Sequence, residues 1–334
     1  MAIIVSRWKD LCVVLLLLAL CGLTPGNGMA APDAPAYQLA LSQYDSGNYR
    51  GAATTLSATL EKHPESASTE LLLARCYYEL KQWDQAVFHA KSAVRISPSD
   101  SEAHLWLARS YGRKAGASHS LKLAVETRKE FEKAVTLSPD NVEARNDLME
   151  YYLDAPWVLG GSKSKASKQA QAIAALDPIE GYLAWGQVDL HTGQLAQARQ
   201  QYQRVLASKV DRVGPYLDAA SFFLAQGDQT QFMQAVQAAF RANAADMRLK
   251  YFRGIELILQ GKAFPEAERD LKSYLADAPS RNDFPSHAAA MSWLGELYAR
   301  WGKKELATRQ YEAALAIDPS IAQARQGLAR LHSQ

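Results

Sequence analysis

The stretch from Ala288 to Ile321 reads AAAMSWLGELYARWGKKELATRQYEAALAIDPSI, and it predicts two helices joined by a tight turn. Its large side chains recur every three or four residues, which is the spacing of one buried helix face. Gly302 ends the first predicted helix and Pro319 ends the second. Because such a pair cannot bury its apolar face alone, we expect further copies to stack beside it.

The same stretch resembles the tetratricopeptide repeat, a helix–turn–helix unit of about 34 residues. The matching positions are Met291, Leu294, Gly295, Tyr298, Ala307, Tyr311, Ala314 and Pro319. Less complete copies begin at Asp33, Ala67, Ser101, Val142, Ile179, Val213 and Met247. The resemblance implies an all-α fold: a right-handed superhelix, or α-solenoid, of about eight helix–turn–helix repeats with a C-terminal capping helix.

These repeats organise almost the whole chain. We assign a signal peptide to 1–30, a linker to 31–36, repeats 1–4 to 33–178, repeats 5–8 to 179–321, and the capping helix to 322–334. The third and fourth repeats exceed the period, and we place their extra residues at the turns, in 112–123 and 154–165. Because both turns emerge on one edge of the superhelix, we expect them to build one projection, the insertion edge.

The first thirty residues have the features of an export signal. Arg7 and Lys9 form a basic start, and the apolar run Leu11–Leu23 follows. Small residues up to Ala30 suit a signal peptidase, so we expect cleavage after Ala30 and export to a bacterial periplasm. The chain that remains is expected to have no integral membrane span.

Two other fates of this segment stay open. The sequence around Cys21 resembles a degraded lipobox, which would leave Cys21 acylated at a new N-terminus. An uncleaved signal anchor is the other alternative. Beyond the signal only Cys76 remains, so no internal disulfide can form, and we expect a buried, inert thiol.

Charge and motifs exclude several classes of function. The chain has 37 Lys and Arg against 35 Asp and Glu, and removing 1–30 leaves 37 − 2 = 35 against 35 − 1 = 34. This balance predicts no nucleic-acid partner. The seven histidines lack the spacing of a helical zinc site, and Gly160–Ser164 lacks the strand that a phosphate-binding loop requires. We expect no cofactor, no metal and no catalytic residue.

The resemblance implies a groove lined by the first helix of each repeat, which would bind a protein or peptide. The candidate contact residues are Tyr37, Tyr44, Arg75, Tyr78, Arg109, Arg113, Glu150 and Asp154. Along this series an aromatic and basic surface gives way to an acidic one, which could match the charges of a bound segment. The alternative is that Arg109 and Arg113 pair with Glu150 and Asp154 on the next helix.

The insertion edge is the second candidate surface. Its sequence Ala155–Lys163 reads APWVLGGSK, in which Trp157 and Leu159 are candidate partner-binding residues. Alternatively, Trp157, Val158 and Leu159 form a small core under the neighbouring insertion.

These features predict a non-catalytic scaffold or adaptor of the bacterial cell envelope, which binds a protein or peptide partner in the groove or on the insertion edge. The first alternative is a lipid-anchored envelope-assembly factor. The second is a regulatory or substrate-holding subunit of an envelope enzyme.

Overall fold

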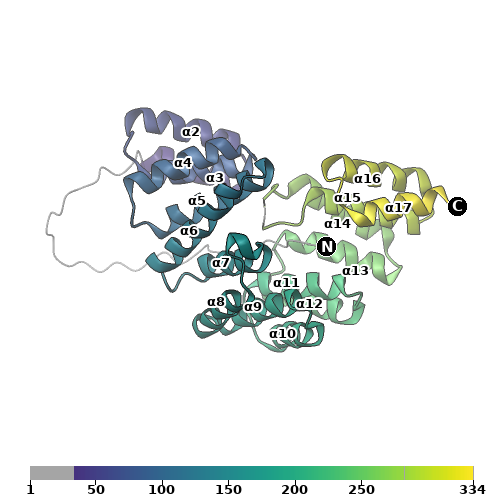
Figure 1. Cartoon of the computed structure of the whole chain (residues 1–334). Coiled ribbons are helices and arrows are strands. Elements are labelled where there is room, and N and C mark those ends of the chain that lie inside the picture. The colour runs from purple at the N-terminus through teal and green to yellow at the C-terminus, as the bar shows by residue number, and fades with distance from the viewer. Residues whose placement is uncertain (1–33, 282, 334) are drawn as a thin grey trace, which may run out of the picture. The chain divides into compact units, whose positions relative to one another are not determined.

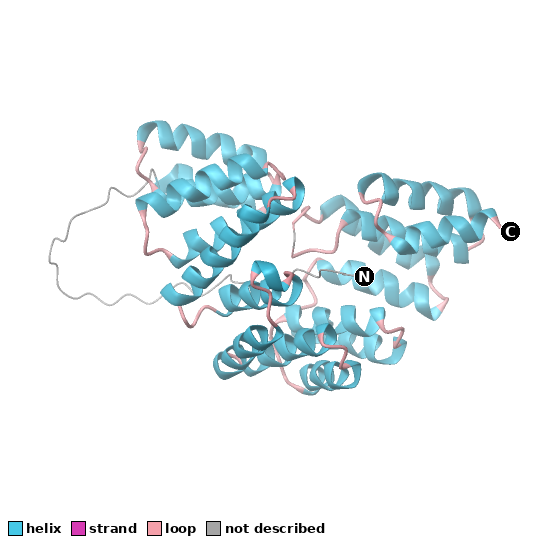
Figure 2. Cartoon of the chain, viewed as in Figure 1, coloured by secondary structure: helices cyan, strands magenta, loops and turns pink. Residues whose placement is uncertain are grey.

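The computed structural model describes residues 34–281 and 283–333. Within these ranges it contains seventeen α-helices, one 3-10 helix and no strand (Figures 1 and 2). The helices follow one another as eight helix–turn–helix repeats and a final helix, as the sequence predicts, and the all-α fold class is confirmed. The predicted signal segment 1–30, with Cys21 and the cleavage position, lies outside the described residues.

The described chain forms two compact units, residues 34–194 and 195–333. The first contains α1 (Ala34–Asp45), α2 (Tyr49–Lys62), α3 (Ala67–Glu79), α4 (Trp83–Ile96), α5 (Ser101–Ser118), α6 (Leu121–Leu137), α7 (Val142–Asp154), η1 (Trp157–Leu159), α8 (Lys163–Leu176) and α9 (Pro178–His191). The second contains α10 (Leu195–Ala207), α11 (Val213–Ala225), α12 (Gln229–Ala242), α13 (Arg248–Gln260), α14 (Phe264–Asp277), α15 (His287–Arg300), α16 (Lys304–Ile317) and α17 (Ala322–His332).

Small residues allow these helices to pack closely, as the sequence pattern requires. A Cβ atom added to Gly295 of α15 would lie 2.5 Å from the ring of Tyr311, and one added to Gly327 of α17 would lie 2.3 Å from it. Tyr311 of α16 is fully buried between these two glycines. The Tyr311 ring therefore fits only if positions 295 and 327, which face it from α15 and α17, are glycine.

Most turns between the two helices of a repeat contain a glycine in the left-handed region. Gly302, for example, follows α15 with φ of 76°, and Gly227 follows α11 with φ of 70°. Polar side chains then start many of the helices: Asp100 accepts hydrogen bonds from the backbone N–H groups of Glu102 and Ala103 at the start of α5.

The extra residues of the third and fourth repeats differ in structure. In the third repeat they lengthen α5 and α6, and only His119 and Ser120 form the turn. His119 takes the left-handed position with φ of 52°, and Ser120 caps α6. We expected the extra residues of 112–123 at the turn itself, and most of them instead extend helices. In the fourth repeat, α7 ends at Asp154 and a loop containing η1 leads to α8.

Cys76 is as buried as we expected from the sequence. Its side chain is fully inaccessible, and burial raises the pKa of the thiol to about 12, which keeps it protonated at neutral pH.

Over 34–281 and 283–333, no helix combines the length and the apolar character that crossing a bilayer requires.

Candidate functional site

The first helices of neighbouring repeats contact one another, which brings equivalent positions together on one face. Helix α1 contacts α3, and α3 contacts α5. The guanidinium of Arg75 on α3 lies 4.9 Å from the ring centre of Tyr44 on α1 and 5.1 Å from that of Trp106 on α5. Arg109 lies 4.8 Å from the same indole. We call Tyr44, Arg75, Trp106 and Arg109 the aromatic–arginine row, in which cation–π contacts fix the arginines.

Trp106 is the member of this row that the sequence analysis missed. It is 2 % exposed, and its indole N–H donates to the Glu102 carboxylate at 2.9 Å. The tetratricopeptide pattern does not mark its position. The available signal was its place one helical turn before Arg109 on a predicted first helix.

Arg109 is locked inside the protein by two carboxylates of α7. It is 5 % exposed, and it pairs with Glu143 at 2.7 Å and with Asp147 at 2.5 Å. Burial alone would lower the pKa of Arg109, but the charges of Asp147 and Glu143 outweigh burial and raise it. The alternative that Arg109 is neutralised by the next helix is therefore right, whereas its expected partners, Glu150 and Asp154, are wrong.

Arg113 also differs from the expected pairing. Its Nε donates to the hydroxyl of Tyr78 at 2.8 Å, and its guanidinium lies 5.7 Å from the centre of the same ring. Tyr78 is 4 % exposed and packs edge-on against Trp83 and Trp106. Tyr78 and Tyr44, also 4 % exposed, thus support the arginines from beneath instead of offering their rings to a ligand.

The acidic end of the series lies on α7. Asp154 is exposed, and one of its oxygens lies 2.9 Å from Nε2 of His191 on α9. The other ring nitrogen of His191 lies 3.1 Å from the carbonyl of Gln187, so both nitrogens face acceptors. The hydrogen bond to Asp154, opposed by burial, raises the pKa of His191. Glu150 is half-buried on the same helix, and Tyr37 is half-buried on α1.

The insertion edge exposes its aromatic residue to solvent. Trp157 is 84 % exposed and Val158 is 63 % exposed, while Leu159 is partly buried. The alternative of a small core is therefore wrong for Trp157 and Val158.

The loop that carries Trp157 is nevertheless tightly fixed. The hydroxyl of Tyr151 lies 2.9 Å from the carbonyl of Ala124 and 3.0 Å from that of Leu159, which ties the loop to α6. A Cβ atom on Gly161 would lie 1.7 Å from the carbonyl oxygen of Ala155. The Gly160–Gly161 pair is thus required for the backbone to close this loop.

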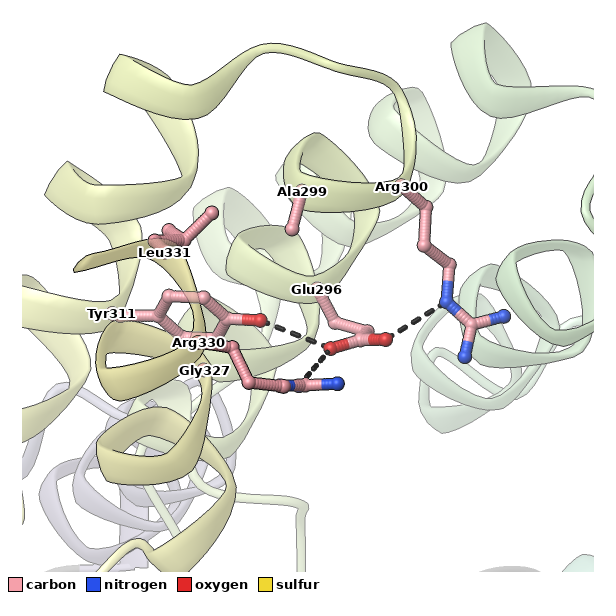
Figure 3. Close-up of a pocket in the computed structure, with 7 residues that line it drawn as sticks. All are labelled: Glu296, Ala299, Arg300, Tyr311, Gly327, Arg330 and Leu331. Carbon is pink, nitrogen blue, oxygen red and sulfur yellow. Dashed lines mark hydrogen bonds and ion pairs between the residues drawn. The ribbon is translucent and has the colours of Figure 1, made fainter. Parts of the chain in front are cut away.

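The second unit contains a polar cluster that the sequence analysis did not identify (Figure 3). It lines a cavity of about 180 Å³ between α15 and α17. The carboxylate of Glu296 accepts hydrogen bonds from Arg300 at 2.8 Å, Arg330 at 2.9 Å and Tyr311 at 3.0 Å. Burial would raise the pKa of Glu296, but the hydrogen bonds from Arg300 and Tyr311 outweigh burial and lower it. With three donors on one carboxylate, the cluster fastens the capping helix to the last repeat.

Metal ligation finds no support in the described part of the chain. There, no group of three or more His, Cys, Asp or Glu side chains is arranged to hold a metal ion.

Comparisons with known proteins agree with the repeat architecture. The family profile of the tetratricopeptide repeat matches residues 37–101 and 251–322. DnaJ homolog subfamily C member 3 of Gallus gallus is 29 % identical over 141 residues, which are 42 % of this chain and 28 % of that protein. RNA polymerase II-associated protein 3 of Mus musculus is 24 % identical over 203 residues, which are 61 % of this chain and 26 % of that protein. The chain thus spans only about a quarter of the length of these relatives.

Solved structures show the same fold. A tetratricopeptide repeat protein from Parabacteroides merdae superposes with a TM-score of 0.50 and 13 % identity, covering 79 % of this chain and 98 % of that one. A chain of the APC/C hetero-tetramer Cut9–Hcn1 superposes with a TM-score of 0.50 and 16 % identity, covering 89 % and 55 %. These structures show the fold, and the family profile together with the consecutive helix pairs identifies the chain as a member of the tetratricopeptide repeat family.

Proposed function

We propose that this protein is a non-catalytic scaffold that holds an extended protein segment along the first helices of its N-terminal repeats. Tetratricopeptide repeat proteins are generally non-catalytic scaffolds. The observation that carries the proposal is the aromatic–arginine row, because it fixes the half-buried Arg75 on a prepared surface beside the exposed Arg113. Binding to a preformed surface avoids the cost of ordering long side chains.

The charges on this face favour one class of partner segment. Arg75 and Arg113 lie on α3 and α5, while α7 carries Glu150 and also Asp154, which pairs with His191. Arg109 is already neutralised by Glu143 and Asp147, so it adds no net charge for a ligand. A segment with acidic side chains toward α3 and α5, and basic side chains toward α7, would match this surface and be held in one register.

Site-specific photo-crosslinking in cells tests this binding face. A photoreactive amino acid replaces Tyr37 of α1, and the matched control replaces Phe88, a 61 % exposed aromatic residue on the second helix α4. We expect one protein to be captured from position 37 and not from position 88. Equal capture from both positions, or none from position 37, would contradict the proposal.

Binding of the captured protein, once purified, tests the role of charge. We expect Arg113→Glu to weaken the complex about ten-fold or more, which corresponds to about 1.4 kcal/mol. Lys91→Glu on α4 makes the same charge change at an exposed position away from this face. If the two substitutions weakened binding equally, the effect would come from net charge and not from the groove.

We also propose that the chain is exported to a bacterial periplasm after cleavage behind Ala30. The basic start, the short apolar run and the small residues before Ala31 support this proposal. Mass spectrometry of the protein purified from cells is expected to give Ala31 as a free N-terminus. Acylated Cys21 would instead establish the lipid-anchored alternative.

A further inference from the structure

We propose that the insertion edge docks onto the surface of an anionic phospholipid bilayer. The docking surface consists of Leu121, Lys122, Trp157, Val158, Lys163 and Lys168, and we call it the lysine–tryptophan edge. It is distinct from the groove residues of the proposed function and would give the scaffold a place at a membrane.

The apolar part of this edge is the strongest exposed hydrophobic feature of the described chain. Among the described residues, the three most exposed large hydrophobic side chains are Trp157 at 84 %, Leu121 at 68 % and Val158 at 63 %. All three belong to the extra residues of the third and fourth repeats. Leu121 opens α6, and η1, which carries Trp157 and Val158, lies against the same helix.

Exposed lysines of α6 and of the first two turns of α8 accompany these apolar side chains in the sequence. Lys122, Lys163 and Lys168 are exposed, and none forms an ion pair within the residues that the structure describes. The nearby carboxylates are already engaged. Glu126 pairs with Lys129, Glu132 pairs with Arg128 and accepts from Tyr152, and Asp154 binds His191. The charges of this edge that lack a counter-charge are therefore positive.

The position of two lysines argues against a purely structural role. Lys163 and Lys165 occupy the first turn of α8, which contains no acidic residue. A helix N-terminus carries a partial positive charge, so cations there destabilise the helix and anions stabilise it. An external anionic surface would turn this unfavourable arrangement into a favourable one.

The combination of side chains fits a lipid surface better than a protein surface. Tryptophan settles at the boundary between headgroups and acyl chains, because its ring is apolar and its N–H is polar. Lysines carry their charge on flexible stems that reach lipid phosphates. The edge offers charge of a single sign, whereas a protein interface is typically fixed in register by complementary charges of both signs.

The loop that carries Trp157 is already ordered in the protein without a membrane. Tyr151 ties the loop to α6, and the backbone N–H of Ser162 donates to the carbonyl of Tyr152 at 2.8 Å. Trp157 is therefore held in solvent by an ordered loop and does not need to unfold from a core to reach the bilayer. With no spanning helix in the described ranges, the contact would be peripheral.

Sedimentation with vesicles tests the proposal on residues 31–334, which include every described residue and exclude the apolar signal segment. The vesicles are phosphatidylcholine alone, or phosphatidylcholine with about 30 % phosphatidylglycerol. We expect binding to the anionic vesicles only, and its loss at about 0.5 M salt, where charges are strongly screened. Equal binding to both vesicles, or to neither, would overturn the proposal.

Matched variants locate the contact. We expect Trp157→Ala to lower partitioning about ten-fold, and the triple change of Lys122, Lys163 and Lys168 to Gln to lower it about a hundred-fold, or about five-fold per lysine. The controls are Phe88→Ala, which removes another exposed aromatic ring, and a triple change of the exposed Lys91, Lys133 and Lys209 to Gln. Controls that lost as much binding would overturn the assignment to this edge.

Crosslinking from position 157 separates this surface from a protein interface. With a photoreactive amino acid at Trp157, we expect capture of lipid from anionic vesicles and in cells. Capture of a single protein from position 157, together with unchanged vesicle binding of Trp157→Ala, would overturn the proposal in favour of a protein contact. The groove test at position 37 gives its result independently, so the two proposals can fail separately.

Discussion

Arg109 illustrates that a charged side chain on a binding face can serve the fold alone. Two carboxylates of α7 and the indole of Trp106 enclose its guanidinium, and 5 % of the residue remains exposed. Arg113, one helical turn further along α5, is exposed and makes a single hydrogen bond to Tyr78. The two arginines should therefore respond differently to removal.

We expect Arg109→Ala to lower the free energy of unfolding by about 3–5 kcal/mol, because Glu143 would lose its cationic partner, and so would Asp147, whose pKa burial already raises. Arg113→Ala should cost about 1 kcal/mol, since it removes one hydrogen bond to the Tyr78 hydroxyl and no ion pair. Urea unfolding followed by circular dichroism measures both. A loss of under 1 kcal/mol for Arg109→Ala would show that α5 and α7 do not depend on this cluster.

Two glycines permit a matched test of backbone space. A methyl group at Gly161 would collide with the carbonyl of Ala155, whereas one at Gly116 of α5 meets nothing within 4 Å. We expect Gly161→Ala to destabilise the protein and disorder the Trp157 loop. Gly116→Ala should stabilise the protein by about 0.5–1 kcal/mol, because alanine suits a helix interior better. Thermal unfolding compares the two, and equal effects would mean that the Gly161 loop can relax.

At the level of the helices, the sequence pattern predicted the helix ends that recur with the repeat period. The end of α15 before Gly302 and the end of α16 before Pro319 follow from local signals, which recur in most repeats. The length of α5 could not be predicted from these signals. This helix continues past the point where the repeat normally turns, and it ends at His119, which takes the left-handed position that glycine usually fills.

The candidate groove was predictable in its positions but not in its pairings. A repeat pattern states which residues lie on a first helix, but not how far the next helix is offset along its axis. Arg109 consequently meets Glu143 and Asp147, which precede the expected Glu150 and Asp154 on α7. The exposure of Trp157 also depends on how one loop closes, which no periodic signal encodes.

The contact between α7 and α9 should depend on pH. Because the pKa of His191 is raised in the folded protein, the Asp154–His191 pair stabilises the fold fully below about pH 6.5, where unfolded histidine is charged. This stabilisation is lost as the pH rises through the higher folded-state pKa. We expect urea midpoints of the natural protein and His191→Gln to differ at pH 5.5 and to converge near pH 8.5. A constant difference across this range would contradict the assignment.

The capping helix provides a second prediction at this scale. Glu296→Ala removes the acceptor shared by Arg300, Arg330 and Tyr311, so α17 should open more often. We expect amide exchange in α17 to accelerate about ten-fold, which corresponds to about 1.4 kcal/mol of local stability. Glu312→Ala, an exposed change on α16, is the control. Unchanged exchange in α17 would show that apolar contacts alone hold this helix.

For the whole molecule, the division into two units has a direct consequence for folding. Stability in a repeat array is approximately a sum of repeat and nearest-neighbour contributions. We expect residues 31–194 and 195–334, expressed separately, to be helical and to unfold cooperatively. Circular dichroism during thermal unfolding measures both fragments. A fragment without a cooperative transition would show that its repeats require the other unit.

The link between Glu296 and Arg330 joins residues one full repeat apart, so α17 occupies the place of a ninth first helix. Its Gly327 receives the ring of Tyr311 much as Gly295 does on the opposite side. A duplicated copy of 288–321, spliced in ahead of Ala322, would therefore meet a surface already shaped to accept it. Gene duplication could therefore lengthen the array by one repeat while α17 keeps the same contacts with the repeat that precedes it.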